Sequence, residues 1–444
     1  MKDKRILLVA IFAVIIVVGW MTTLKAVSGA DIIAAQKELV EEADAYMERK
    51  LYVRAIPLYE EALDSTTELN LEIEEKLLNA YYQYQDMQAY IRLVEARVET
   101  NDAKEGEYLT VARHYVENRK IAKGMELVKK GIDNLGTETL KEYYEENRYE
   151  YKYHSSGCEV IVPTSTNALM AAYNGQNWGY VDGKGKILLP FIYDSATSFE
   201  NDEYAVVSVE GVYYTILSNG DFYGANDGTK GEKLTDVKAI SSGLLIGQKD
   251  GLYSYYGYDF NALASSLQFD DITSFSCGVA AAKKGEKWGI IDESGKSITD
   301  IKYEDIAINS LGCAFANNRA MVKENGVWHL INVAGETLGN ATFADAKAPE
   351  SDGYIAVANE NGRWGFVDSE GELIIDYHYR DAKSFSNQLA PVMVVDKWGY
   401  ISEKNVIAIE DMFLEAEPFH AGSAQVHTTE AMGIICLEYV EAQQ

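Results

Sequence analysis

Apolar and polar residues alternate in short runs along the C-terminal two-thirds of the chain, and the runs recur about every 36 residues. The unit at residues 279–298 shows the pattern clearly. An alternating apolar segment is followed by a polar turn, Trp-Gly, two β-branched residues and an Asp-x-x-Gly turn. Such alternation, bounded by Gly, Asp and Ser, predicts short strands joined by tight turns. We therefore predict about eight similar β units between residues 149 and 444.

A large side chain marks the centre of every unit. The eight centres are Trp178, Tyr213, Tyr253, Trp288, Trp328, Trp364, Trp398 and Met432. In most units an alanine stands eight residues earlier, as Ala280 does before Trp288. We expect this small residue to face the ring across the hairpin, and the glycine after Trp to mark a close backbone approach. Asp and Gly in the next turn, such as Asp292 and Gly295, tolerate left-handed backbone angles.

The two ends of this array complement each other. The last unit, around Met432, ends without the Tyr-Asp segment that follows other units, whereas residues 151–154 precede the first unit and resemble residues 301–304. The N-terminal piece could therefore complete the last unit, and closure of this kind removes exposed sheet edges. A propeller-like ring is the favoured prediction, and an open stack of β-hairpins is the alternative.

Residues 31–148 have helical spacing instead, with Ala and Tyr recurring at positions where two helices would approach closely. The first copy is the clearest, and two more follow at a period of about 34 residues. The matching residues are Ala43, Tyr46, Ala55, Tyr59 and Ala62, then Leu77, Ala80, Ala89, Leu93 and Ala96, then Ala112, Tyr115, Gly124, Val128 and Gly131. We predict three helical hairpins, a stop at Gly136 and a closing helix at residues 137–149.

The N-terminal segment is the most apolar part of the chain. Residues 6–24 carry no charge and are long enough to cross a bilayer as one helix. Lys2, Lys4 and Arg5 precede this segment, which predicts a cytoplasmic N-terminus and an extracytoplasmic remainder. The alternative is a cleaved signal peptide, but its apolar core would be shorter. We expect residues 1–30 to form an uncleaved single-pass anchor in the cell membrane.

Charge and composition narrow the classes of function. The formal net charge is −29, which argues against nucleic-acid binding because that requires a basic surface. The four cysteines, Cys158, Cys277, Cys313 and Cys436, form no C-x-x-C pair, and the histidines form no H-x-x-H set. We expect the cysteines to be small core residues, although a disulfide between units stays open. The sequence therefore predicts no metal site, no cofactor and no catalytic residues, and it leaves the binding residues unknown.

Two resemblances follow from these motifs. Residues 31–148 resemble tetratricopeptide repeats, which implies a groove that holds a peptide or a partner helix. Residues 149–444 closely resemble the WG-repeat family of bacterial proteins, and residues 362–399 match its pattern almost throughout. The matching residues are Trp364, Gly365, Phe366, Val367, Asp368, Gly371, Glu372, Tyr379, Phe385, Ser386, Leu389 and Ala390. This resemblance implies little about catalytic or binding chemistry.

The predicted fold class is thus multidomain, α followed by all-β. It combines a transmembrane helix at residues 6–24, a tetratricopeptide-like solenoid at residues 31–148 and a WG-type β array at residues 149–444. We expect a non-enzymatic, membrane-anchored scaffold that binds a protein or peptide partner outside the cytoplasm. A cell-wall glycan-binding module is the alternative, and a hydrolase with a cryptic carboxylate pair is a weaker one. Burial of the unit tryptophans would exclude sugar stacking on them.

Overall fold

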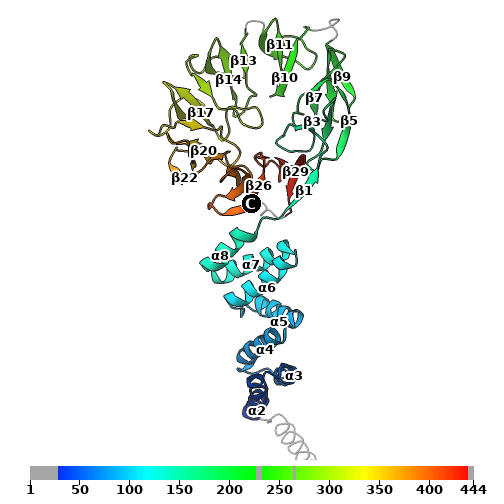
Figure 1. Ribbon diagram of the computed structural model, residues 1–444, viewed down its shortest axis with the longest axis vertical. Coiled ribbons are helices and arrows are strands. Elements are labelled where there is room, and N and C mark those ends of the chain that lie inside the picture. The colour runs from blue at the N-terminus through cyan, green and yellow to red at the C-terminus, as the bar shows by residue number, and fades with distance from the viewer. Residues whose placement is uncertain (1–28, 227–232, 264–266, 439–444) are drawn as a thin grey trace, which may run out of the picture. The chain divides into compact units, whose positions relative to one another are not determined.

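The computed structural model describes residues 29–226, 233–263 and 267–438. The chain divides into two compact units, with the boundary between Tyr144 and Glu145. The first unit is helical and the second is built from strands (Figure 1).

The helical unit consists of three hairpins and the start of a further helix. Its helices are α2 (Gly29–Glu48), α3 (Tyr52–Ala62), α4 (Asn70–Tyr84), α5 (Met87–Glu99), α6 (Glu105–Glu117), α7 (Ile121–Leu135) and α8 (Glu138–Asn147). Gly136 ends α7 in the left-handed conformation, at a φ of 65°, as predicted. Asp86 caps α5 by accepting a hydrogen bond from the Ala89 amide at 3.0 Å.

Small residues bring the helices of this unit together. Ala43, Ala55 and Ala62 are buried, as the spacing predicted. A Cβ on Gly131 would lie 2.9 Å from the Tyr108 ring, so α7 approaches α6 closely there. Ala96 was predicted to be the counterpart of Ala62 in the second hairpin. It is exposed on the surface, whereas Ala62 is buried.

The strands described form eight sheets, which are the blades of a β-propeller (Figure 1). Blade 1 contains β2 (Val160–Ile161), β3 (Met170–Tyr173), β4 (Trp178–Val181) and β5 (Ile187–Tyr193); blade 2 contains β6 (Ser195–Ala196), β7 (Tyr204–Val209), β8 (Val212–Leu217) and β9 (Phe222–Asn226). Blade 3 contains β10 (Asp236–Ser241), β11 (Leu244–Lys249) and β12 (Leu252–Tyr256); blade 4 contains β13 (Asp271–Ile272), β14 (Val279–Lys284) and β15 (Lys287–Asp292).

The remaining blades follow the same antiparallel order. Blade 5 contains β16 (Asp305–Ile306), β17 (Arg319–Glu324) and β18 (Val327–Asn332); blade 6 contains β19 (Asp345–Ala346), β20 (Ile355–Ala358), β21 (Trp364–Val367) and β22 (Leu373–Tyr379). Blade 7 contains β23 (Asp381–Ala382), β24 (Leu389–Met393), β25 (Trp398–Ser402) and β26 (Ile407–Phe413); blade 8 contains β27 (Glu415–Ala416), β28 (Ser423–His427), β29 (Met432–Leu437) and β1 (Tyr151–Ser155). All eight predicted unit centres lie on the third strand of a blade.

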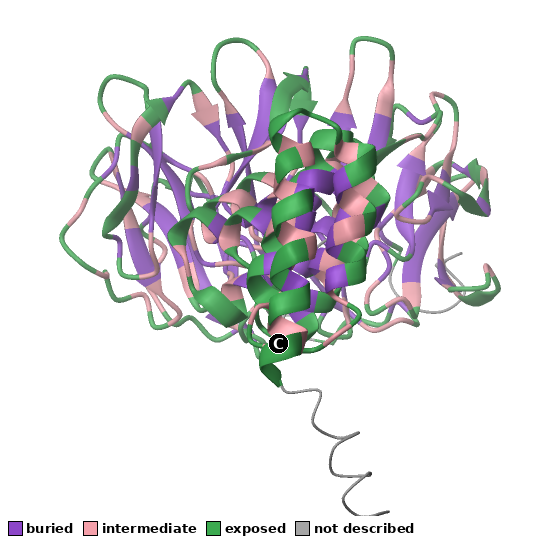
Figure 2. Ribbon diagram, turned by 90° about the horizontal axis from the view of Figure 1, so that it is seen from below, coloured by how far each residue is buried: buried purple, intermediate pink, exposed green. Residues whose placement is uncertain are grey.

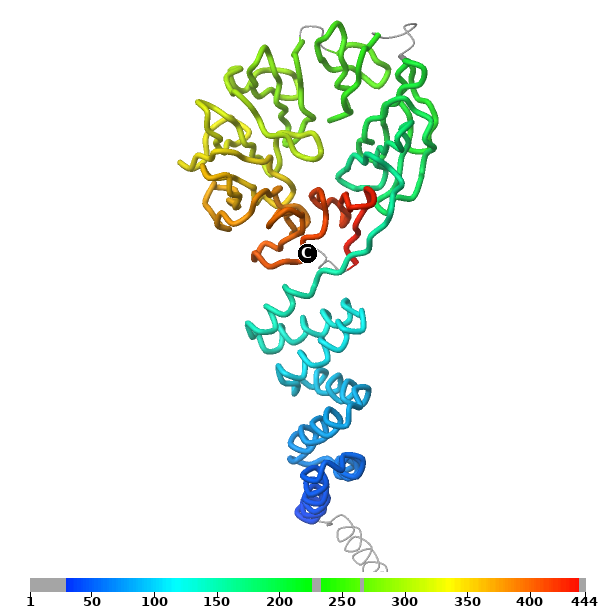
Figure 3. Tube along the Cα trace, in the orientation of Figure 1, coloured from blue at the N-terminus to red at the C-terminus, as the bar shows by residue number. Residues whose placement is uncertain are grey.

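Blade 8 closes the ring with strands from both ends of the β unit. β1 pairs with β29 in antiparallel register, from Tyr151 opposite Leu437 to Ser155 opposite Gly433. The two strands lie side by side in Figure 3, where the start of the β unit meets its red end. Residues 151–154, which the sequence analysis assigned to the last unit, are therefore the fourth strand of blade 8.

The core of the propeller lies between blades. Each sheet is buried on both faces, because alternate residues of a strand face opposite neighbours. In β14, Val279 and Ala281 pack toward blade 5, while Ala280 and Ala282 pack toward blade 3. Figure 2 shows the consequence: buried positions follow the strands, and exposed positions concentrate in the connecting turns.

One predicted contact is wrong. Ala280 pairs with Ile291, and Trp288 pairs with Lys283, so the alanine does not face the tryptophan. The two residues instead pack on opposite faces of blade 4, because they lie an odd number of positions apart across the hairpin. The small side chain at this position serves the contact with the preceding blade.

The predicted close approach at the Trp-Gly glycine is confirmed. A Cβ on Gly365 would lie 2.5 Å from the carbonyl oxygen of Ile375, where β21 and β22 change register. The Asp-x-x-Gly turn is also confirmed. The Asp292 carboxylate accepts hydrogen bonds from the amides of Ser294 and Lys296, both at 2.9 Å, and Gly295 has a φ of 79°.

The predicted fold class requires a correction. The structure is an eight-bladed β-propeller with a helical N-terminal region. The predicted arrangement, which included a transmembrane helix, is wrong. Within the described ranges, none of the helices has the length and apolar character needed to span a membrane. The segment at residues 6–24, to which that helix was assigned, lies outside these ranges.

Candidate functional site

The loops between the first and second strands of the blades meet one another in the propeller. Neighbouring blades are joined here by hydrogen bonds, four of which involve a side chain and one of which joins two backbone groups. These bonds run from Ser241 Oγ to Phe275 O (3.2 Å), Ser274 N to Gly312 O (2.9 Å), Asn317 Nδ2 to Ser351 O (2.7 Å), Gly422 N to Asn387 Oδ1 (2.9 Å) and Asn167 Nδ2 to His420 O (2.7 Å). Because these partners belong to successive blades, the loops form a connected inner rim.

The loop of blade 5 is the longest of these connections. It spans residues 307–318, whereas its counterparts in blades 4, 7 and 8 span residues 273–278, 383–388 and 417–422. The extra length carries Ser310 to blade 8, where its Oγ lies 2.7 Å from His420 Nε2. The blade 5 loop thus connects two blades that are not neighbours in the ring.

A buried carboxyl group and a buried imidazole meet at this point. Glu350 is 4% exposed and His420 is 5% exposed. Glu350 Oε1 accepts a hydrogen bond from the Ser310 amide at 3.0 Å, and its Oε2 lies 3.8 Å from His420 Nε2. Burial raises the pKa of Glu350 to about 7 and lowers the pKa of His420 to about 4. The 3.8 Å separation would permit an ion pair, but burial of this extent favours the neutral form of both groups.

The arrangement of these three residues differs from a serine hydrolase triad. In a triad, the serine hydroxyl and the carboxylate contact different nitrogens of the imidazole. Here the hydroxyl of Ser310 and the carboxyl group of Glu350 both approach Nε2 of His420. The carboxyl group therefore cannot orient the imidazole for proton transfer from the serine, and the cluster fixes the blade 5 loop instead.

A cavity of about 190 Å³ adjoins this loop beside Glu350 and His420, and two larger cavities flank the loop. The larger has a volume of about 670 Å³ and is lined by residues of blades 1 to 5, with Ser165, Ser198, Ser242 and Ser274 among them. The second has a volume of about 360 Å³ and is lined by residues of blades 5 to 8, among them Trp328, Ala346, Glu350 and Lys383. The inner rim therefore presents both a hydroxyl-rich surface and a narrower recess beside an aromatic ring.

Lysine side chains repeatedly bridge adjacent blades near these cavities. Lys347 lies 4.5 Å from the centroid of the Trp364 ring and pairs with Asp381 of the next blade at 3.3 Å. Lys383 lies 5.5 Å from the centroid of the Trp398 ring and pairs with Glu417 of the next blade at 2.7 Å. Each ammonium group thus combines a cation–π contact within its own blade with an ion pair to the next.

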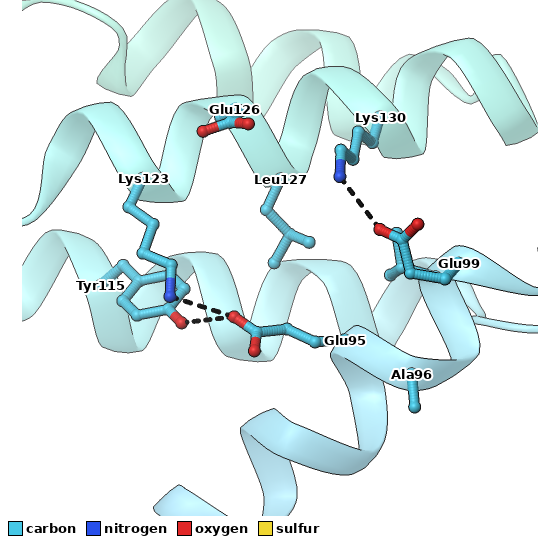
Figure 4. A pocket seen from close by; sticks show the side chains of 9 residues that line it. Glu95, Ala96, Glu99, Tyr115, Lys123, Glu126, Leu127 and Lys130 are labelled. Carbon is cyan, nitrogen blue, oxygen red and sulfur yellow. Dashed lines mark hydrogen bonds and ion pairs between the residues drawn. The ribbon is translucent and has the colours of Figure 1, made fainter.

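The helical unit has a groove of its own, between α5 and α7 (Figure 4). Its volume is about 380 Å³, and Leu127 lies between two ion pairs that cross it. Lys123 pairs with Glu95 at 3.1 Å, and Lys130 pairs with Glu99 at 3.2 Å. These charges are largely exposed, so each pair contributes little to stability.

The cysteines differ from one another in exposure. Cys158 and Cys436 are buried, as predicted, but Cys277 is exposed and Cys313 is partly buried; none of the four is in a disulfide. Burial raises the pKa of the Cys313 thiol to about 12, which keeps it protonated. In the described part of the chain, no group of three or more His, Cys, Asp or Glu residues is arranged to hold a metal ion.

No binding residue was predicted from the sequence, and the residues of the inner rim carry no motif that marks them. Glu350 and His420 belong to different blades and carry no local motif. The available signal was weak: Trp288 and Trp328 are farther apart than the centres of most neighbouring units, but Tyr213 and Tyr253 are equally far apart.

Comparison with known proteins supports the repeat assignment. The model of the WG containing repeat family matches residues 178–213, 263–288, 288–328 and 364–398. The search of curated proteins found no match.

Solved structures with a similar arrangement are distant in sequence. Hsv2 of Kluyveromyces lactis has 8% identity and a TM-score of 0.37, covering 65% of this chain and 96% of its own. The WD40 domain of SCAP from fission yeast has 9% identity and a TM-score of 0.38, covering 67% and 99%. A structure described as YCF48 bound to D1 peptide has 12% identity and a TM-score of 0.33, covering 66% and 97%.

Proposed function

We propose that this protein is a non-enzymatic binding or scaffold protein, and that the inner rim of its propeller holds a protein or peptide partner. The observation that carries this proposal is the cavity of about 670 Å³, to which loops from five successive blades contribute. Concave sites with a few convergent polar groups are typical of ligand recognition. Hydroxyl groups at this rim can donate and accept hydrogen bonds with the backbone of an extended peptide.

The burial of four of the five unit tryptophans argues against the glycan alternative, and the fifth, Trp178, is partly exposed beside Tyr173. Trp288, Trp328, Trp364 and Trp398 are each 6% exposed, so their rings offer no open face for a sugar to stack on. The serine, imidazole and carboxyl groups also lack triad geometry, which favours binding over hydrolysis by this cluster.

We also propose that the helical unit is a tetratricopeptide-like stack that contributes to the scaffold. Its support is the three hairpins with buried alanines at the predicted close contacts. The location outside the cytoplasm stays a prediction. Protease added to intact cells should digest both units, and their protection would contradict that location.

Site-specific crosslinking tests the binding proposal. A photoreactive phenylalanine analogue at Ser242, on the inner rim, should capture a polypeptide in cells of the source species. The same analogue at Asn361, in an exposed outer turn of blade 6, is the matched control. Capture from Ser242 but not from Asn361 would support the rim as the binding surface. Equal capture from both positions, or no polypeptide from either, would contradict it.

A further inference from the structure

The blade 5 loop contains an insertion of six residues relative to the loops of blades 4, 7 and 8. Both ends of the loop match the loop of blade 4. At its start, the amide of Ala307 bonds to the third residue of the following strand, as the amide of Thr273 does. At its end, Phe315 is followed by the same antiparallel bridge that follows Phe275. Residues 308–313 are therefore additional to the loop that the other blades form, and we call them the inserted tip.

The inserted tip is a closed turn of its own. The Asn309 amide bonds to Cys313 O at 2.8 Å, and Asn309 Oδ1 accepts the amides of Leu311 at 3.1 Å and Cys313 at 2.9 Å. Ile308 is exposed and the other five residues of the tip are partly buried, whereas Phe315 at the base of the loop is 1% exposed. The tip can therefore move as a unit and keep its own hydrogen bonds, while Phe315 keeps the base of the loop in the core.

Hydrogen bonds to blades 4, 6 and 8 hold the tip in place. They join Ser310 N to Glu350 Oε1 (3.0 Å), Ser310 Oγ to His420 Nε2 (2.7 Å), Asn309 Nδ2 to Pro349 O (3.2 Å) and Ser274 N to Gly312 O (2.9 Å). Burial favours the neutral forms of Glu350 and His420. Neutral hydrogen bonds are weaker than those of charged groups. The tip is thus held as a small ligand would be, by a few polar contacts to buried side chains.

The inserted tip stands where three cavities meet. Asn309 lines all three of them, with volumes of about 190, 360 and 670 Å³. Ser310 lines the two larger cavities, and Leu311 and Cys313 line the smallest and the largest. The tip is therefore the partition between these cavities. Its displacement would join them into one space, lined by residues of all eight blades, which we call the axial site.

We propose that the inserted tip is an internal ligand of the axial site, and that the partner polypeptide displaces it with a polar turn of its own. Glu350 then accepts a main-chain amide of the partner, and His420 bonds to a serine or threonine hydroxyl group. Because the tip is tethered beside the site, it competes at a high effective concentration and lowers the partner's apparent affinity. This inference rests on the proposed function of the rim and names the site and the residue type that the partner presents.

A free peptide with the sequence of the tip tests whether the axial site is a ligand site. The peptide comprises residues 308–313 with Cys313→Ser and an N-terminal trifluoroacetyl group, and its fluorine NMR signal is observed. The protein is the full chain without residues 308–313, so that Ala307 joins Ala314. The signal should broaden in a saturable manner. The dissociation constant should be at least about tenfold lower than with the natural chain, whose own tip competes. A peptide with Ser310→Ala should bind the deletion variant at least about tenfold more weakly.

A single substitution decides the question if the deletion variant does not fold. Ser310→Ala in the full chain keeps the length of the loop and removes the hydroxyl group that contacts His420. It should lower the dissociation constant of the serine peptide by at least about threefold. Ser218→Ala, in an exposed turn of blade 2, is the matched control and should leave it unchanged. The proposal is overturned if the peptide binds neither altered chain better than the natural one, or if the alanine peptide binds as well as the serine peptide.

The crosslinking experiment separates this outcome from the proposed function. Ser242 lines the same cavity as the tip, so deletion of residues 308–313, or Ser310→Ala, should raise the capture of polypeptide from Ser242 by at least about threefold. Capture that both changes leave unaltered would refute displacement of the tip and leave the binding function standing. Binding of the peptide without any captured polypeptide would refute the proposed function of the rim and leave the axial site supported.

Discussion

Glycine in the Trp-Gly pair is required by the backbone of the neighbouring strand. At Gly365 there is no room for a Cβ, because the carbonyl oxygen of Ile375 and the backbone of Asp376 lie 2.5 to 3.0 Å from its ideal position. Gly399 has the same environment in blade 7, with Ile409 O at 2.6 Å. The glycine therefore permits the fourth strand to change register against the third, as both pairs of strands do.

We expect Gly365→Ala to destabilise the propeller by about 2 to 4 kcal/mol, because the added methyl group overlaps backbone that cannot move without breaking strand pairing. The free energy of unfolding, measured with urea, gives this value. Gly106→Ala is the control, since a Cβ there meets nothing within 4 Å. Equal effects of the two substitutions would show that the register change does not depend on the missing side chain.

The two buried titratable groups of the inner rim give opposite pH dependences. Glu350 has a folded pKa of about 7 against an ordinary value of 4.5, so its contribution to stability is complete below pH 4.5 and is lost as pH rises through 7. His420 has a folded pKa of about 4 against 6.5, so its contribution is complete above pH 6.5 and is lost as pH falls through 4. The two slopes oppose each other between pH 4.5 and 6.5.

Glu350→Gln should remove the loss of stability between pH 4.5 and 7, so that the pH dependence caused by His420 is no longer opposed. We expect the variant to gain stability as pH rises from 4 to 6.5, and to exceed the natural protein by about 2 kcal/mol at pH 8. Urea midpoints across this pH range provide the measurement, with exposed Glu360→Gln as control. A parallel pH profile for Glu350→Gln and the natural protein would mean that the carboxyl group is not held neutral.

At the scale of elements, a buried arginine joins two hairpins of the helical unit. Arg97 of α5 is 3% exposed and pairs with Glu74 of α4 at 2.7 Å and with Glu107 of α6 at 3.1 Å. It also donates a hydrogen bond to the Asp102 carbonyl oxygen at 2.9 Å. One side chain thus connects the second hairpin to the third.

Arg97→Ala should destabilise the helical unit by about 3 kcal/mol, because it leaves the buried carboxylate of Glu107 without a cation. Thermal unfolding followed by circular dichroism at 222 nm reports on the helices. Lys141→Ala, which removes only an exposed ion pair with Glu138, is the comparison and should cost less than about 0.5 kcal/mol. Similar losses of stability in the two variants would show that Arg97 contributes no more than an exposed residue does.

The elements differ in how far the sequence predicted them. Period-two alternation predicted a strand at every unit centre. The extra segment at residues 151–154 indicated the strand that pairs with β29. The face occupied by Ala280 was predicted wrongly, because the hairpin register depends on where the turn begins, and spacing along the chain does not fix this. The cluster of Ser310, Glu350 and His420 had no local signal, since three separate blades contribute to it.

At the scale of the whole molecule, closure of the ring should couple the first and last strands of the β unit. Lys152→Pro removes a backbone donor opposite Cys436 and should increase hydrogen exchange across residues 433–437. Exchange in β14, on blade 4, should change little, because each blade packs mainly against its neighbours. Lys152→Ala is the matched control, as it keeps the backbone N–H. Unchanged exchange at residues 433–437 would show that β29 is stable without β1.

The pairing of β1 with β29 also determines how the ring responds to mechanical tension. Tyr151 lies opposite Leu437, so the point where the chain enters the β unit and the point where its last strand ends are adjacent. A force that pulls these two points apart acts across the hydrogen bonds and breaks them one after another, starting with the bond between the Glu438 amide and the Glu150 carbonyl oxygen. The interfaces between the other blades carry none of this load until β1 has peeled away. For this direction of pulling, we expect blade 8 to open first, and at a lower force than strands sheared along their length.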